Sequence, residues 1–390
     1  MEGEPPTELT LITEGATRLR VALPPKERGP GTRTDEVFFN PAMALNRDLS
    51  IAVLAAETAR RGGAPMKVLD GLAATGARGL RFAVEVPGHQ VTLNDHDPRA
   101  VARIEDNARL NNVLVRVTRR SLGGLLGDEG FDWIDVDPFG SPAPFTGPAT
   151  GALHNHGILA LTATDAPALN GVYVNACRRR YLAEPLRCPF GHEVALRLLA
   201  AHAVREAAKH EVALRPLLSH ATDHYYRLYL RLEYGAGRAD KALASLRYAT
   251  FCKACGDRRL VPEPPKACPA CEGPVKWGGP LWAEGLMDAA FLQEVKAATV
   301  GRTFQKPRDL EKALPRFMEE AEAPPLLYDV HEIAPLAGVD VPKTPLILEA
   351  LRARGYRAAL THLHDRGIKT DATAREFAEV LRALGRQSGE

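Results

Sequence analysis

The segment that decides the fold runs from Lys67 to Gly79 and reads KVLDGLAATGARG. Residues 66–70 have the apolar pattern of a buried strand, and residues 78–85 continue with the spacing of a helix. The small residues between them let the backbone turn tightly and approach a ligand closely. Because open α/β sheets bind ligands at the carboxyl ends of their strands, this strand-to-helix turn predicts a binding loop.

Strand and helix patterns alternate around this segment. Further strands are predicted over 90–95, 114–117, 133–137, 157–164 and 227–233, and helices over 46–61, 98–111 and 193–210. The Gly-rich stretch between 117 and 133 is predicted to be a loop, and residues 1–36 an irregular lead-in with a strand-like run over 17–23. The alternation predicts an α/β fold with a doubly wound, mostly parallel sheet.

The chain has 390 residues, which is more than one core usually supports, so two domains are expected. The composition shifts near residues 235–245, which predicts one domain over 1–240 and a smaller α+β domain over 241–390. The formal net charge of +2 does not by itself indicate a nucleic-acid partner, so any basic surface has to be local. No apolar run reaches the ~20 residues that cross a bilayer, which favours a cytoplasmic protein without membrane contact. No obligate protein partner is evident.

The turn after the first strand predicts a cofactor that contains adenosine. Asp95 ends the second strand, where an acid can accept hydrogen bonds from both hydroxyls of a ribose. The loop is not G-x-G-x-x-G, because Ala73 and Ala74 occupy its middle, and it has no Walker lysine. A cofactor without a pyrophosphate therefore fits, and S-adenosylmethionine fits better than NAD or ATP. The alternative is a tight turn whose glycines serve only packing.

The segment Phe131–Pro142 reads FDWIDVDPFGSP, a strand pattern that stops at an acid, a proline and an aromatic ring. Asp137 at the strand end can accept an N–H from an exocyclic amine and take its proton. The carbonyl of Pro138 can orient the other hydrogen, and Phe139 can stack on a base. The alternative is that Asp137 caps a turn before proline. The other two acids, Asp132 and Asp135, are expected to be structural.

Four cysteines have the spacing C-x2-C-x12-C-x2-C: Cys252, Cys255, Cys268 and Cys271. This spacing predicts one tetrahedral zinc ion, and four protein thiolates leave no position for a water, so the site is expected to be structural. The alternatives are reduced cysteines or two redox pairs. Two clusters of cations, Arg178–Arg180 and one between Arg302 and Arg316, are candidates for phosphate contact or solvated helix surface.

The chain resembles the tRNA guanine-26 N2-dimethyltransferase family over nearly its full length. The residues that carry the resemblance are Val37–Asp48, Asp70–Arg81, Leu93–Asp95, Asp137–Pro142, Thr361–His362 and Gly367–Ala372. It implies a Rossmann-like methyltransferase domain, a C-terminal tRNA-binding domain, and methylation of guanine N2 with S-adenosylmethionine.

Further roles follow from the resemblance. It implies that Asp137 is the catalytic acid/base and that Phe38 and Phe139 form aromatic walls of the guanine pocket. The residues expected to bind the cofactor are Arg47, Asp70, Ala73, Gly76, Arg78, Asp95 and Ser121. The family usually has an acid after the third strand to meet the adenine, whereas this chain has Ser121 there.

Two other functions remain open from the sequence. One is a methyltransferase that acts on another base amine or RNA position, such as adenine N6. The other is a zinc-bearing RNA-binding or chaperone protein whose cofactor fold is vestigial.

Overall fold

The computed structural model describes residues 9–23 and 37–387. These residues form two compact units that alternate along the chain. The first takes the residues up to Thr164 together with Tyr229–Tyr234 and Ala290–Leu314, and the second takes the remainder. The domain division at residue 240, which rests on the composition shift, stays a prediction.

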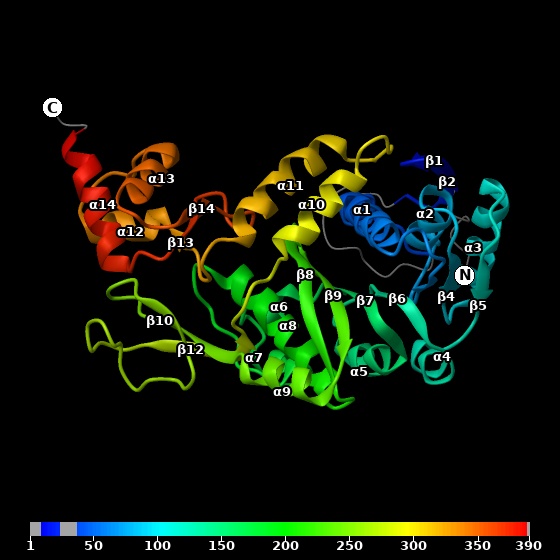
Figure 1. Ribbon diagram of the computed structural model, residues 1–390, viewed down its shortest axis with the longest axis horizontal. Helices are drawn as coiled ribbons and strands as arrows, with labels where there is room; N and C mark the ends of the chain where they lie inside the picture. The colour runs from blue at the N-terminus through cyan, green and yellow to red at the C-terminus, as the bar shows by residue number, and fades with distance from the viewer. Residues whose placement is uncertain (1–8, 24–36, 388–390) are drawn as a thin grey trace, which may run out of the picture. The chain divides into compact units, whose positions relative to one another are not determined.

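A seven-stranded, mostly parallel sheet carries the fold (Figure 1). Its strand order is β5-β4-β3-β6-β7-β9-β8. The strands are β3 Lys67–Asp70, β4 Gln90–Asn94, β5 Arg116–Thr118, β6 Phe131–Val136, β7 Leu153–Ala163, β8 Val212–Thr222 and β9 Tyr225–Tyr234. Strand β3 pairs in parallel with β4 and β6, β4 with β5, and β6 with β7. The doubly wound parallel sheet predicted from the sequence is thereby confirmed.

The strand order reverses between β3 and β6. The chain runs outward from β3 through β4 to β5 and then returns to β6 on the other side of β3. Asp70, the last residue of β3, is in register with Asp135 of β6. Ligands of open α/β sheets bind at the carboxyl ends of the strands where the order reverses. The segments that follow Asp70 and Val136 therefore meet at the predicted binding edge.

Helices cover both faces of this part of the sheet. They are α1 Ala44–Arg60, α2 Ala77–Glu85, α3 Pro98–Asn111, α4 Leu122–Asp128 and α5 Ala143–Ala152, with a 3-10 turn, η1, at Pro41–Met43. Figure 1 shows α1 and α2 on one face and α4 and α5 on the other. Trp133 of β6 is fully buried and meets the ring of Phe82 of α2 edge to face, with centroids 5.7 Å apart. Burying such a side chain contributes about 1.5–3 kcal/mol, which fixes α2 against β6.

Most predicted elements are confirmed, and one prediction is wrong. Helix α3 has the predicted bounds. The stretch predicted as a loop between 117 and 133 contains helix α4, because the Ser121 hydroxyl caps its first turn by accepting from the Gly124 N–H at 3.3 Å. Helix α5 has no predicted counterpart, since Pro148 within it weakens the helical pattern. Strand β8 was also missed.

A β-hairpin precedes the sheet. Strands β1 Thr10–Glu14 and β2 Thr17–Val21 pair antiparallel, and β2 confirms the predicted strand-like run. Asn107 of α3 holds the hairpin, accepting from the Arg20 N–H at 2.8 Å and donating to its carbonyl at 3.3 Å. The rest of the predicted lead-in, 1–8 and 24–36, lies outside the described residues.

The second unit contains helices, two small sheets and its own apolar core. Its helices include α6 Ala166–Leu169, α7 Val174–Tyr181, α8 Gly191–Ala208, α9 Ala236–Ala244, α12 Val330–Ala337, α13 Thr344–Ala353 and α14 Ala374–Gln387. Its antiparallel sheets are β11-β10-β12, from Arg258–Val261, Leu246–Phe251 and Lys276–Trp282, and β13-β15-β14, from Tyr328–Asp329, Gly367–Thr370 and Ala358–Leu360. The fully buried Ile333, Ile347 and Phe377 belong to the core between α12, α13 and α14. Helix α10 Ala289–Ala298 belongs mainly to the first unit, and helix α11 Pro307–Ala321 is divided between the two at Leu314.

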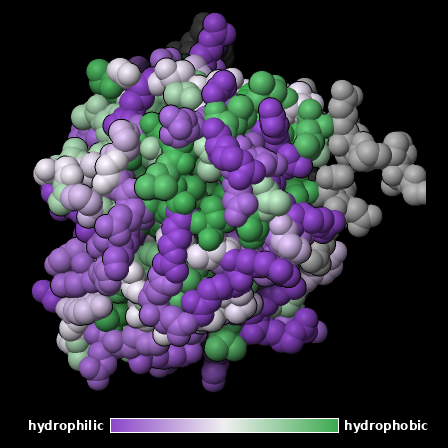
Figure 2. Space-filling view, turned by 90° about the vertical axis from the view of Figure 1, so that its right-hand side faces the viewer, coloured by the Kyte–Doolittle hydropathy of each residue, from purple (hydrophilic) through white to green (hydrophobic). Residues whose placement is uncertain are grey.

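The surface is mixed in hydropathy. Figure 2 shows one face on which hydrophilic side chains surround a band of hydrophobic ones. In the part of the chain that the structure describes, no helix has both the length and the apolar character that a membrane span requires. With a net charge of only +2, contacts to an anionic partner have to come from local groups of cations.

Candidate functional site

The turn after β3 is locked by hydrogen bonds to neighbouring strands. The Gly71 N–H donates to the Asp135 carbonyl at 2.9 Å, and Asn94 Nδ2 donates to the Gly71 carbonyl at 3.1 Å. A Cβ at Gly79 would lie 2.7 Å from the side chain of Leu93, so only glycine lets α2 pack this closely on β4. The loop is thus rigid before any ligand binds.

The carboxylate of Asp95 closes the same loop. It accepts from the Ala74 N–H at 2.9 Å through Oδ2 and from the Asp97 N–H at 3.0 Å through Oδ1. Ala74 and Gly76 have left-handed backbone conformations, with φ of 47° and 78°. Each carboxylate oxygen has used one lone pair, so Asp95 can still accept hydrogen bonds from two hydroxyls.

Asp70 is a buried acid with an acidic neighbour. It accepts from the Gly79 N–H at 2.9 Å and so caps the first turn of α2. Burial and the nearby Asp135 carboxylate raise its pKa to about 7, although Arg78 opposes them. The end of β3 therefore carries a carboxyl group that titrates close to neutral pH.

Arg78 contacts several polar side chains at the binding edge. Its Nη1 donates to Asn46 Oδ1 and to Ser50 Oγ, each at 2.6 Å. Its Nη2 donates to Asp137 Oδ2, and its Nε lies 3.4 Å from Asp135 Oδ1. The guanidinium thus joins α1 and α2 to the end of β6 and fixes the position of the Asp137 carboxylate.

Asp137 directly follows β6, and the segment after it is pinned to the end of β7. The Gly140 N–H donates to Thr164 Oγ1 at 2.7 Å, and Gly140 has a φ of 90° that favours glycine. Phe139 is 55% exposed and meets Phe38 edge to face, with centroids 4.4 Å apart. Asp137 Oδ1 has no hydrogen-bond partner among the described residues. A carboxylate oxygen with free acceptor capacity therefore lies in the segment that carries an exposed aromatic ring.

Arg47 is held by an acid from the N-terminal hairpin. Its Nε and Nη2 donate to the two carboxylate oxygens of Glu14 at 2.5 and 2.6 Å, and Glu14 also pairs with Arg81 at 3.1 Å. Burial alone would raise the pKa of Glu14, but the two arginines outweigh it and lower that pKa. Arg81 further pairs with Asp48 at 2.7 Å, so the ion pairs extend into α1.

The structure brings several predicted site residues together at the β3–β6 edge. Arg78 forms an ion pair with Asp137 and interacts electrostatically with Asp70. Asp95 holds the loop that contains Ala73 and Gly76. Ser121 caps α4, which occupies one acceptor site of the hydroxyl that the sequence suggested for adenine contact.

Sequence reasoning missed four residues: Glu14, Asn46, Asp48 and Ser50. Asn46 and Asp48 lie inside the Val37–Asp48 motif, which was their only available signal. Glu14 is 33 residues before Arg47, and nothing in the sequence links the two.

The side chain of Asn46 indicates whether the binding edge suits a polar cofactor. Its side chain is buried and its Nδ2 has no hydrogen-bond partner among the described residues, although its Oδ1 accepts from Arg78. Leaving a buried N–H unsatisfied costs about 1–3 kcal/mol, so an acceptor group bound here would be favoured. Together with the spare acceptor sites of Asp95, this donor suits a cofactor that carries both hydroxyls and an anionic group.

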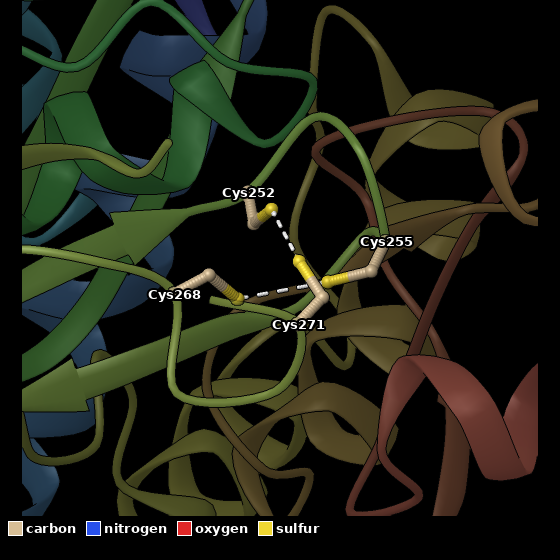
Figure 3. Close-up of side chains that lie close together, drawn as sticks. All are labelled: Cys252, Cys255, Cys268 and Cys271. Carbon is tan, nitrogen blue, oxygen red and sulfur yellow. Dashed lines mark hydrogen bonds between the residues drawn. The ribbon is translucent and has the colours of Figure 1, made fainter. Parts of the chain in front are cut away.

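The four cysteines of the predicted metal site converge in the second unit. Figure 3 shows their side chains turned toward one another, and their sulfur atoms all lie within 4.8 Å of one another. The two closest pairs, Cys252 with Cys271 and Cys255 with Cys268, are each 3.6 Å apart. Zinc–sulfur bonds of about 2.3 Å would place tetrahedral ligands about 3.8 Å apart. The closest pairs are near this separation and the remaining pairs lie within about 1 Å of it, so the cluster suits one zinc ion.

The two predicted groups of cations lie on the surface. Arg178, Arg179 and Arg180 are all exposed, and Arg178 pairs with Glu184 at 2.7 Å and Arg180 with Asp165 at 3.0 Å. In the second group, Lys306, Arg308 and Lys312 are exposed on or beside α11, and the Lys306 N–H donates to Asp48 at 2.6 Å. Both groups contain cations that an anionic partner can reach.

The doubly wound sheet has acids at the ends of its first two strands and an acid-proline-phenylalanine segment at the switch point. This combination defines a Rossmann-like methyltransferase. Residues 19–382 match the family described as N2,N2-dimethylguanosine tRNA methyltransferase. The chain belongs to this family.

Proteins similar to this chain agree with that assignment. The tRNA (guanine(26)-N(2))-dimethyltransferase of Methanopyrus kandleri is 38% identical over 98% of this chain and 99% of its own length. The protein of the same name from Thermococcus kodakarensis is 36% identical over 96% of this chain and 99% of its own. The structure of Trm1 from Pyrococcus horikoshii with S-adenosyl-L-methionine matches with a TM-score of 0.84 and 32% identity, over 95% of this chain and 99% of that chain.

Proposed function

We propose that this protein transfers one or two methyl groups from S-adenosylmethionine to the exocyclic N2 amine of guanine in tRNA, at position 26. The observation that carries the proposal is the setting of Asp137. Its carboxylate follows β6 at the switch point, is held by Arg78 through Oδ2, and keeps Oδ1 without a partner among the described residues. Family membership and the relatives' names narrow the amine to guanine N2.

The guanine pocket in this proposal is built from the segment after β6. Phe139, more than half exposed and in contact with Phe38, supplies a flat surface on which a base can stack. The carbonyl of Pro138 orients one amine hydrogen while Asp137 accepts the other. Because guanine 26 is within folded tRNA, the base has to be extruded, which costs a few kcal/mol.

The cofactor residues in this proposal surround the loop after β3. Asp95 accepts the ribose hydroxyls, and the loop with Ala73 and Gly76 lets the backbone approach the adenosine. Arg47 and Arg78 contact the cofactor, and Asp70 sets the start of α2. Ser121 takes the place of the acid that usually meets the adenine.

The chemistry requires a nucleophilic amine and an acceptor for its proton. The cofactor supplies an electrophilic methyl group when it is bound. The lone pair of the guanine amine is delocalised into the ring, and a carboxylate that accepts an amine hydrogen restores nucleophilicity. Asp137 Oδ1 takes the proton as the nitrogen–carbon bond forms, while Arg78 keeps the carboxylate in place. Positioning two bound reactants contributes about 7–11 kcal/mol in well-oriented systems.

The remaining parts of the proposal concern partners and location. Residues 1–240 perform the methyl transfer, and residues 241–390, with the zinc site, bind tRNA. Exposed cations beside α11 are available for phosphate contact. The protein acts in the cytoplasm.

The proposal is tested by identifying the methylated nucleoside. The protein is incubated with methyl-labelled S-adenosylmethionine and a tRNA transcript, and the RNA is digested to nucleosides. We expect label in N2-methylated guanosine, and none when guanine 26 is replaced by adenine. Label in N6-methyladenosine would favour the other methyltransferase. Binding of tRNA without binding of S-adenosylmethionine would favour an RNA-binding protein with a vestigial fold.

A further inference from the structure

The second unit contains a surface hollow that the proposed reaction does not use. Its volume is about 380 Å³, and its lining includes Leu186, Arg187, Lys276 and Trp277. These residues come from the segment before α8 and from the start of β12, which follows the zinc cysteines. We call this surface the Trp277 hollow.

The floor of the Trp277 hollow is held rigidly. Glu184 and Gly279 exchange two backbone hydrogen bonds of 2.8 Å, which tie the segment to β12. A Cβ at Gly278 would lie 2.7 Å from Leu186 Cβ, so only glycine lets the segment lie flat on the strand. A surface built in this way presents its side chains in fixed positions.

The charge of the hollow is positive. Arg178 also lines it, but its Nε and Nη2 donate to Glu184 at 2.7 and 3.1 Å, so this pair is neutral. Arg187 and Lys276 are exposed, and among the described residues neither side chain has an ion-pair or hydrogen-bond partner. Two unpaired cations therefore flank the hollow.

Trp277 differs from the other two tryptophans of the chain. It is 40% exposed, whereas Trp133 and Trp282 are 0% and 2% exposed. Tyr248 meets it edge to face, with centroids 5.8 Å apart, and so supports the ring. An exposed, supported indole beside free cations has the composition of a single-stranded nucleic-acid site, where bases stack on aromatic rings and cations meet phosphates.

We propose that the Trp277 hollow binds a nucleotide of the tRNA substrate, with its base stacked on Trp277 and adjacent phosphates on Arg187 and Lys276. The inference rests on the proposed function, because tRNA is the anionic, base-bearing partner that function supplies. Stacking tolerates any base, so the hollow anchors the tRNA without selecting the guanine that is methylated.

The three tryptophans make a direct test possible. Acrylamide quenching of tryptophan fluorescence is measured for the full-length, zinc-loaded protein with and without a saturating tRNA transcript. We expect tRNA to reduce quenching in the wild type and to have no such effect in Trp277→Phe, whose two remaining tryptophans are buried. Quenching that saturating tRNA leaves unchanged in the wild type would overturn the inference.

Substitutions test the contribution of each group to tRNA affinity. Trp277→Leu, which removes the aromatic face, is expected to weaken binding roughly tenfold, whereas Trp277→Phe stays within about threefold of wild type. Arg187→Ala is expected to reduce the slope of log affinity against log salt by about 0.7–0.9, the loss of one phosphate contact. Lys343→Ala removes another exposed cation of the same unit and serves as the matched control. Zinc content and melting temperature verify that each variant is folded.

The outcomes separate this inference from the proposed function. If Trp277→Leu and Arg187→Ala bind tRNA with wild-type affinity and salt slope and still methylate guanine, the inference about the Trp277 hollow is wrong and the proposed function stands. Absence of methylated guanine after incubation of the wild-type protein would instead contradict the proposed function.

Discussion

At the scale of single residues, the binding edge concentrates charge that is largely buried. Asp70, Asp135 and Arg78 are all buried, and Asp137 is only 21% exposed at its side chain. The Arg78 guanidinium contacts Asp135 and Asp137 directly. Asp70 has no direct ion pair with it, and burial together with the Asp135 carboxylate raises the pKa of Asp70 to about 7. Protonation of Asp70 reduces the negative charge of this edge.

The raised pKa of Asp70 predicts a pH-dependent stability. Because the folded-state value of about 7 exceeds the ordinary 3.8, the contribution of Asp70 to stability is largest below about pH 4 and is lost as the pH rises through 7. Asp70→Asn stays neutral and can still accept from the Gly79 N–H. We therefore expect the free energy of unfolding of Asp70→Asn to rise relative to that of the wild type between about pH 4 and 7, by about 1.4 kcal/mol for each pKa unit, and its melting temperature to rise with it. A difference that is constant with pH would contradict this account.

At the scale of elements, short-range patterns were predictable and contacts between elements were not. The period-two pattern of β6 and the cysteine spacing are local, so both could be read from the sequence. The contacts of Arg78 with Asn46 and of Arg47 with Glu14 join residues 32 and 33 positions apart, and they depend on how α1, α2 and the hairpin pack. Helix α4 could not be predicted from its composition, because the glycines in LGGLLGD are typical of a loop and the Ser121 cap is a weaker signal.

Loss of one cysteine of the predicted zinc site is expected to lower both the zinc content and the melting temperature. Cys268→Ser removes one of four converging thiolates, and Cys188→Ser is the matched control because Cys188 lies outside the cluster. We expect metal analysis to find about one zinc per chain in the wild type and control and markedly less in Cys268→Ser. The melting temperature should fall only in Cys268→Ser, since apparent zinc affinities of about 10–16 kcal/mol contribute to folding. Equal zinc content in both variants would contradict a four-cysteine site.

At the scale of the whole molecule, the chain joins a site for base chemistry to features that suit RNA binding. The methyltransferase edge was predictable because its motifs follow consecutive strands, and parallel strands bring their carboxyl ends to one edge. The Trp277 hollow was not, because Arg187 and Trp277 are 90 positions apart and meet only through the bridge between Glu184 and Gly279. A net charge of +2 gave no indication of either surface.

The most direct test of the central claim is the rate of methyl transfer in a single turnover by Asp137→Asn. The asparagine can still accept a hydrogen bond from Arg78 but cannot take the amine proton, so we expect a rate about 10²–10⁴ times lower, with S-adenosylmethionine and tRNA affinities close to wild type. Asp132→Asn on the same strand, whose carboxylate contacts Arg61 and the Lys67 N–H, should keep the wild-type rate. A folded Asp137→Asn protein that transfers methyl groups to guanine at the wild-type rate would contradict the account.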